Sequence, residues 1–342
     1  MVDKTQEGNL DILWIRVIQY RSSEHFREIL KACTRFRNLA PYNAMLVEMQ
    51  RPGSMYVLTE DQWEERCHRV LKPNARPLII LVPFGPVEFV FEIGDTMQSK
   101  KNGILIGPSD EEILNEIAAP YKIKQDVPVR MLDNLNRNLL MHGIDTDFGM
   151  VAGASYAAKI ELLYNNRKDI VVPVNKSRMV RWQAGYLLSV NRNAENSEQF
   201  ASICHELGHL FCYHLPMPGD WKEKKWKVRS PEHKWKEFEA ESVSWIVCER
   251  LGIHNTSEGY LAGYVDTTDT ESYTYISEQV SVERIMAAAN EIERMLKNLD
   301  YRSGLLYKHC DGFKQLCRML SHEKEKKQHQ NNLMPPSYYH KP

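Results

Sequence analysis

The HELGH run at residues 205–209 constrains what this 342-residue chain can fold into more than any other stretch. It lies in SEQFASICHELGHLFCYH, where apolar residues recur at helical spacing and the leading polar residues can cap a helix. Residues i and i+4 of a helix lie one above the other, so His205 and His209 can bind the same metal ion. The alternative is a surface helix that carries these residues by chance. The small and apolar character of residues 201–210 argues against it, since polar groups there require a partner.

Glu206 completes the chemistry that this spacing predicts. It lies on an adjacent part of the helix surface, where its carboxylate can hold a water molecule that the metal binds. Zinc lowers the pKa of such a water toward neutrality, and the carboxylate accepts the proton as the water attacks a carbonyl carbon. We therefore expect one zinc ion per chain, with Glu206 as the general base.

Two histidines need at least one more protein ligand, and the histidines downstream are poor candidates. Metzincins place a third histidine six residues after the second, but position 215 is a leucine, which excludes that class. On a continued helix His214 would be rotated well away from His209. His233 and His254 stay open as ligands, although each lies near a helix end or in a loop.

The segment KEFEAESVSWIVCERLGI offers a better third ligand, because acids on an otherwise apolar helix are costly unless they serve a purpose. Glu237 and Glu241 are four residues apart and share one helix face. This spacing resembles thermolysin-like peptidases, in which a ligand glutamate precedes by four residues an acid that orients a metal-bound imidazole. The resemblance implies Glu237 as the ligand and Glu241 as the orienting acid. Glu239 and Glu241 stay open as ligands. It also stays open that these acids bind no metal and are present only because the dipole of a helix favours acidic residues near its N-terminus.

The order of elements predicts an α+β chain. Hydrophobic periodicity and turn residues indicate that the first 95 residues form helices and a small antiparallel sheet. Residues 94–110 are rich in turn formers, and we expect either a domain boundary or an irregular excursion there. Two strands are expected shortly before the HELGH helix, as in the core of a zinc peptidase, where an edge strand can pair with an extended peptide. The expected strands cover 57–59, 77–83, 87–93, 170–174 and 185–190, and the expected helices cover 10–39, 109–119, 129–141, 234–251 and 277–299.

Composition and charge limit the cellular compartment and the partners that we expect for this protein. The net charge is −1, so no global field attracts nucleic acid or a membrane surface. No apolar run approaches the roughly 20 residues that cross a bilayer, and the polar, acidic start of the chain is unlike a signal peptide. Seven cysteines without a CxxC pair indicate reduced thiols. We therefore expect a cytoplasmic protein without a membrane partner, and a disordered tail over 321–342.

HELGHLFCYH followed by EFEAESVSWIVCERLGI resembles the metallopeptidase domain of ImmA/IrrE proteins and of ArdC-type antirestriction proteins. YNAMLVEMQRPGSMYVLTEDQW and RVLKPNARPLIILVPFGPVEFVFEIGDT are similar to the ArdC N-terminal domain, which binds single-stranded DNA. Where ArdC proteins have the sequence HELTHWTGH, this chain has HELGHLFCYH, which is closer to the ImmA/IrrE motif. The resemblance implies a helix-and-sheet domain over 1–120 and a zincin-like, gluzincin-type metallopeptidase domain over 121–320. The substrate would be a protein or a peptide.

Single-stranded DNA is the second partner that the resemblance implies, through the N-terminal domain. Residues 1–120 are not basic overall, with 14 Lys and Arg against 17 Asp and Glu. Single-strand binding combines a positive groove with stacking aromatic rings. The alternative to a peptidase is a binding protein that keeps the zinc fold for structure and blocks restriction without cleavage. The candidate DNA contacts are Arg35, Arg37, Tyr42, Trp63, Arg69 and Lys72.

Overall fold

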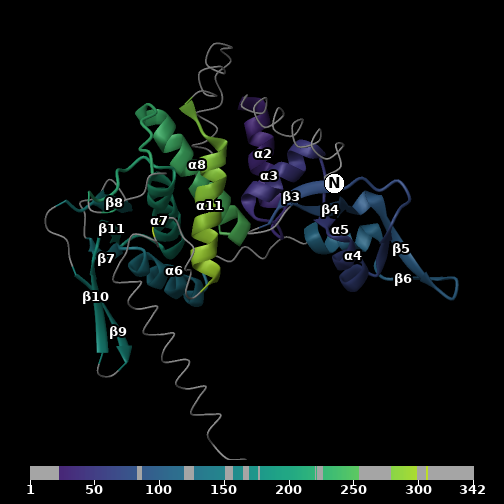
Figure 1. The fold of residues 1–342 in the computed structure, drawn as a ribbon, viewed down its shortest axis with the longest axis horizontal. Coiled ribbons are helices and arrows are strands. Elements are labelled where there is room, and N and C mark those ends of the chain that lie inside the picture. Colours follow the sequence, from purple (N-terminus) through teal and green to yellow (C-terminus); the bar gives the residue numbers. More distant parts are fainter. Residues whose placement is uncertain are drawn as a thin grey trace, which may run out of the picture. The chain divides into compact units, whose positions relative to one another are not determined.

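The computed structural model describes residues 23–82, 87–118, 127–150, 157–164, 169–175, 178–219, 221, 226–253, 279–298 and 306. The tail that we predict to be disordered, residues 321–342, lies outside the described residues, and so does His254. The chain divides into two compact units, which are treated separately below. Figure 1 labels their helices and strands. Unit 1 comprises Met1–Pro128, Asn193–His214 and Arg229–Glu293, and unit 2 comprises Val129–Arg192, Leu215–Val228 and Arg294–Pro342.

The described part of unit 1 begins at residue 23 with two helices and a three-stranded antiparallel sheet of order β1-β4-β3. Helix α4 follows β1 and starts with a capping box, in which the side chains of Thr59 and Gln62 each bond the other's backbone N–H. Trp63 of α4 is fully buried in an apolar cluster with Leu58 of β1, Ile93 and Ile113, and its indole N–H donates to the carbonyl of Phe91 at 2.9 Å. The elements are α2 (Ser23–Arg35), α3 (Pro41–Gln50), β1 (Val57–Leu58), α4 (Glu60–Cys67), β3 (Leu78–Leu81), β4 (Val87–Glu92) and the 3-10 helix η1 (Ile93–Asp95).

Residues 94–110 are not irregular, which corrects the sequence prediction. They contain a hairpin of β5 (Thr96–Lys101) and β6 (Ile104–Ile106), and β5 also pairs with β2 (Arg69–Leu71). Asn102 and Gly103 form the turn with φ of 53° and 81°, the left-handed conformation that a tight hairpin requires and that Asn-Gly adopts readily. Helix α5 (Asp110–Ala118) follows the hairpin.

Three long helices complete unit 1: α7 (Asn196–Phe211), α8 (His233–Leu251) and α11 (Val282–Lys297), of which the part up to Glu293 belongs here. Helices α7 and α8 pack along their length, and Ser244 of α8 donates to the carbonyl of Ala201 of α7 at 2.8 Å. The buried Arg250 of α8 ion-pairs with Glu293. It also donates to the carbonyl of Cys33, in the last turn of α2, and to that of Leu39, after α2, both at 2.6 Å. Unit 1 thus includes residues from both sides of position 120, and the domain boundary there stays a prediction.

Unit 2 contains helix α6 (Val129–Met141) and two small sheets. In the three-stranded sheet β11 (Tyr186–Asn191) lies between β7 (Ile144–Met150), to which it is parallel, and β8 (Ala158–Leu162), to which it is antiparallel. The second sheet is the antiparallel pair β9 (Asp169–Asn175) and β10 (Arg178–Gln183). The predicted strands at 170–174 and 185–190 are therefore present, whereas β7, β8 and β10 were not predicted.

The described elements mix helices with small, mainly antiparallel sheets, so the predicted α+β class is confirmed. Within the described parts of the chain, no helix combines the length and apolar character that crossing a membrane requires.

Candidate metal site

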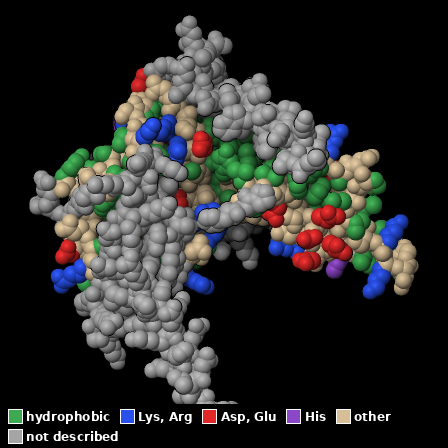
Figure 2. Space-filling model, in the orientation of Figure 1, with side chains coloured by type: hydrophobic (Ala, Val, Ile, Leu, Met, Phe, Trp, Pro, Cys, Tyr) green, Lys and Arg blue, Asp and Glu red, His purple; other side chains and the backbone are tan. Residues whose placement is uncertain are grey.

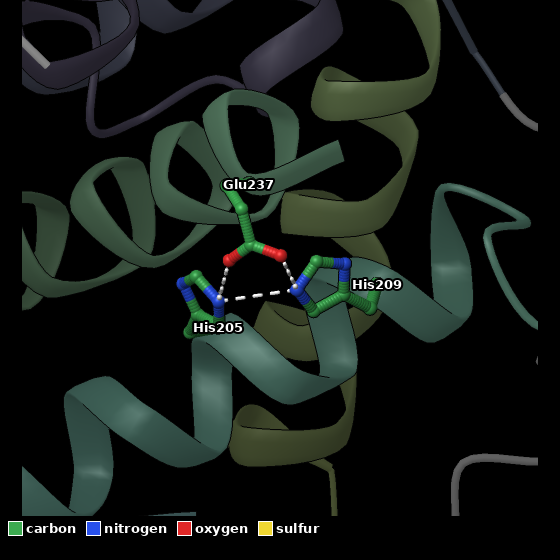
Figure 3. Close-up of side chains that lie close together, drawn as sticks. All are labelled: His205, His209 and Glu237. Carbon is green, nitrogen blue, oxygen red and sulfur yellow. Dashed lines mark hydrogen bonds and ion pairs between the residues drawn. The ribbon is translucent and has the colours of Figure 1, made fainter. Parts of the chain in front are cut away.

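His205 and His209 project from the same face of α7, and their Nε2 atoms are 3.1 Å apart. Glu237 reaches toward both rings from the first turns of α8, as Figure 3 shows. Its two carboxylate oxygens lie 3.3 Å from the Nε2 atom of His205 and 3.5 Å from that of His209. The structure therefore brings together at one point the three donor groups that the sequence suggested, and this group could hold a metal ion.

The three side chains are only partly buried, with 20% of His205, 15% of His209 and 26% of Glu237 exposed. Hydrogen bonds to His205 and His209 hold the pKa of Glu237 far below its usual value, so the carboxylate is ionised. Burial opposes charging of His205, but its contacts with Glu237 and Glu241 outweigh burial and raise its pKa to about 9. Burial also lowers the pKa of His209, and there it prevails over the attraction of Glu237. A cation is thus favoured at this point.

Glu241 lies behind His205, one helical turn after Glu237 on α8. The Nδ1 atom of His205 is 2.8 Å from its carboxylate, to which the ring N–H donates. A neutral imidazole that donates from Nδ1 has its lone pair on Nε2, so a metal ion that displaces the Nε2 proton of His205 would meet that lone pair. Here the Nε2 atom faces Glu237 and His209. This is the arrangement expected for an acid that orients a metal ligand.

Glu206 follows His205 on α7 and is partly buried. After burial and the bonds to Glu237 and Glu241, its charge is a further influence that raises the pKa of His205. The charge of Glu206 is thus felt at the His205 ring, and its role as the general base stays a prediction.

Of the alternative ligands, Glu239 does not join this group. Glu239 is fully buried and ion-paired with Arg229 and His214, away from the Nε2 atoms of His205 and His209. His233 is 87% exposed, with its Nδ1 atom 3.4 Å from a carboxylate oxygen of Glu237.

The expectation that His214 points away from His209 is wrong. Their Nδ1 atoms are 2.9 Å apart. The prediction extended helical geometry to residue 214, but α7 ends at Phe211 and the chain reverses at Tyr213, where φ is 66°. Proline at position 216 was the one sequence signal that the helix had to stop before it.

Most of the side chains that we considered as DNA contacts interact with other groups of the protein instead. Trp63 and Arg69 are 0% and 1% exposed, so neither can stack on a base or contact a phosphate, and that prediction is wrong for both. Arg35 donates to the carbonyl of Ser54 at 2.7 Å, and Lys72 donates to that of Gly94 at 2.7 Å. DNA contacts by Arg35 and Lys72, and likewise by Arg37 and Tyr42, stay predictions.

A scan of protein-family models, a search of curated proteins and a search of solved structures each found no match to this chain. The resemblance to ImmA/IrrE and ArdC proteins accordingly stays a prediction from the motifs.

Proposed function

We propose that this protein is a zinc-dependent metallopeptidase of the ArdC-like, ImmA/IrrE-related group, with a zincin-like, gluzincin-type catalytic domain. The observation that carries the proposal is the convergence of His205, His209 and Glu237 from two helices, with their donor atoms within 4.8 Å of one another. Two imidazole nitrogens and one carboxylate are a donor set that catalytic zinc sites use. The residues present therefore fit a zinc ion.

In this proposal the zinc ion would supply a Lewis acid that polarises a carbonyl and acidifies a water molecule. His205, His209 and Glu237 would hold it, and 15–26% of each of these side chains is exposed, so the group is open to solvent. Glu206 accepts a proton from the attacking water and passes it to the amine that leaves. Glu241 holds the His205 ring so that its Nε2 lone pair faces the site.

The experiment that tests the proposal compares wild-type protein with Glu206→Gln on a mixed-sequence peptide library in the presence of zinc. Loss of a general base lowers hydrolysis by about 10²- to 10⁴-fold, while metal content stays at the wild-type level. Glu198→Gln, an exposed glutamate at the start of the same helix, is the matched control and should cleave as wild type does. Equal cleavage by Glu206→Gln would refute the role of Glu206.

The rival function is a protein that binds single-stranded DNA or a partner protein and cleaves nothing. The face in Figure 2 gives no support to a positive groove, because exposed acids of α4 stand near the basic side chains of the β5–β6 hairpin. These acids are Glu60, Asp61, Glu64 and Glu65. Binding of a labelled single-stranded oligonucleotide that is equal in wild type and Glu206→Gln, with no cleavage by either, would favour the rival.

A further inference from the structure

A second group of buried polar side chains lies behind His209 in unit 1. The His209 and His214 rings meet through their Nδ1 atoms at 2.9 Å, and the Nε2 atom of His214 is 2.8 Å from the Glu239 carboxylate. Arg229 donates to both oxygens of Glu239 at 2.6 Å and 2.8 Å, and the backbone N–H of Ser281 donates at 2.5 Å. The groups form a linear chain that runs from Arg229 through Glu239 and His214 to His209.

This group is not suited to a second metal ion, although Cys212, His214 and Glu239 lie close enough to hold one. The guanidinium of Arg229 already occupies both oxygens of Glu239 and cancels its charge. Burial and the nearby Glu239 raise the pKa of the Cys212 thiol well above its usual value, whereas a metal ligand must be a thiolate. The side chains are arranged instead as a hydrogen-bonded chain.

The donors and acceptors in this chain limit where its protons can lie. Glu239 is ionised beside Arg229 and can only accept, so the Nε2–H of His214 donates to it. In a neutral His214 the Nδ1 atom is then an acceptor, and the Nδ1–H of His209 donates to it. The Nε2 atom of His209 is left with a free lone pair, and it faces His205 and Glu237.

The chain reverses direction directly after α7, and this reversal brings His214 back next to His209. The N–H of His214 donates to the carbonyl of His209 and the N–H of Tyr213 to that of Leu210, both at 3.0 Å, which is a Schellman motif. Tyr213 takes the left-handed position, where glycine is usual and other residues are strained by about 1 kcal/mol. Arg284 stacks 4.4 Å from its ring centroid, and the N–H of Arg229 donates to its carbonyl at 2.8 Å.

We propose that His214 is a positioning residue, which fixes the tautomer and orientation of His209 by linking it to the buried Glu239–Arg229 ion pair. The inference rests on the proposed metal site. The two imidazoles of the proposed site are then anchored differently: His205 donates directly to the carboxylate of Glu241, and His209 meets the imidazole of His214. Arg229 neutralises the charge of Glu239 at the far end of the chain that holds His209.

Zinc affinity, measured by competition with a chromophoric chelator, tests the proposal on the full-length protein. His214→Leu keeps much of the volume but offers no acceptor to His209, and it should weaken zinc binding by about 10- to 100-fold. His214→Gln supplies an amide that can accept from His209 and donate to Glu239, so it should bind zinc far more tightly than the leucine variant. Cys212→Ala, in the same buried group, is the packing control and should bind as wild type does.

Proton–nitrogen NMR spectra of the zinc-loaded wild type provide a second readout that a purely structural role would not produce. They should show His209 protonated at Nδ1, with His214 protonated at Nε2 alone. Wild-type affinity in His214→Leu, or an equal loss in Cys212→Ala, would overturn the positioning role while the metal site stands. Two zinc ions in wild type and one in Cys212→Ala would instead establish a second metal site. A wild type that binds no zinc would refute the proposed function itself.

Discussion

Gly208 of α7 lies against Ala240 of α8 so closely that a methyl group added at Gly208 would meet the Ala240 Cα atom at 2.9 Å and its carbonyl oxygen at 3.0 Å. Glycine within a helix is less favourable than alanine by roughly 0.5–1 kcal/mol, so close packing of the two backbones is what it provides here. His205 and His209 belong to one of these helices and Glu237 to the other. The absence of a side chain at Gly208 therefore sets the distance over which the ligands meet.

Gly208→Ala should destabilise the protein by about 1–3 kcal/mol and weaken zinc binding, because α8 must move away from α7. Denaturant unfolding and a zinc titration measure the two effects. Gly219→Ala is the control, since a methyl group there meets nothing within 4 Å. An unchanged zinc affinity in Gly208→Ala would show that the helix spacing does not limit the site.

Glu241→Ala should lower zinc affinity by about 10- to 100-fold without removing a ligand, because His205 loses the acceptor of its Nδ1–H at 2.8 Å. Glu241→Gln should lose less, since its amide oxygen can still accept that hydrogen bond. The chelator competition assay separates the two variants. If both lost zinc as completely as Glu237→Gln, Glu241 would be a ligand and the assignment of Glu237 would need revision.

His142, which follows α6 in unit 2, should make folding sensitive to acid. The ring is fully buried, and burial lowers its pKa to about 4, while a hydrogen bond from its Nδ1–H to the Asn138 carbonyl at 2.6 Å opposes the shift. An unfolded histidine has a pKa near 6.5, so the unfolded chain takes up the proton first as the pH falls. The contribution of neutral His142 is complete above pH 6.5 and is lost toward pH 4, roughly 3 kcal/mol in all.

The check on His142 is urea unfolding of wild type and His142→Gln between pH 5 and 7. The variant should have a lower free energy of unfolding at pH 7. As the pH falls, its free energy of unfolding should decrease less steeply than that of wild type, the two slopes differing by up to about 1.4 kcal/mol per pH unit. Parallel curves for the two proteins would mean that His142 is not held neutral by the fold.

Local patterns in the sequence predicted the parts of the site that lie within a single helix. The spacing of His205 and His209 follows from helical geometry, and the same is true of Glu237 and Glu241. That these two pairs meet depends on the packing of α7 on α8. The sequence contained the small residues at Gly208 and Ala240, but nothing local identified them as partners.

The wrong predictions also arose where the structure depends on more than one local sequence pattern. His214 was misplaced because helical geometry was applied beyond the end of the helix, where Tyr213 adopts a conformation that tyrosine seldom adopts. Trp63 was considered as a base-stacking residue, but its burial depends on strand β4, about thirty residues further along the chain. The β5–β6 hairpin was recognisable from Asn102-Gly103, a signal that the abundance of turn residues around it obscured.

Metal content tests the central claim most directly. Purified wild type, Glu237→Gln and the exposed control Glu198→Gln would be supplied with zinc, separated from free metal and analysed by mass spectrometry. We predict about one zinc per chain in wild type and in Glu198→Gln, and loss of zinc in Glu237→Gln. No zinc in wild type, or full retention in Glu237→Gln, would contradict the account of this site.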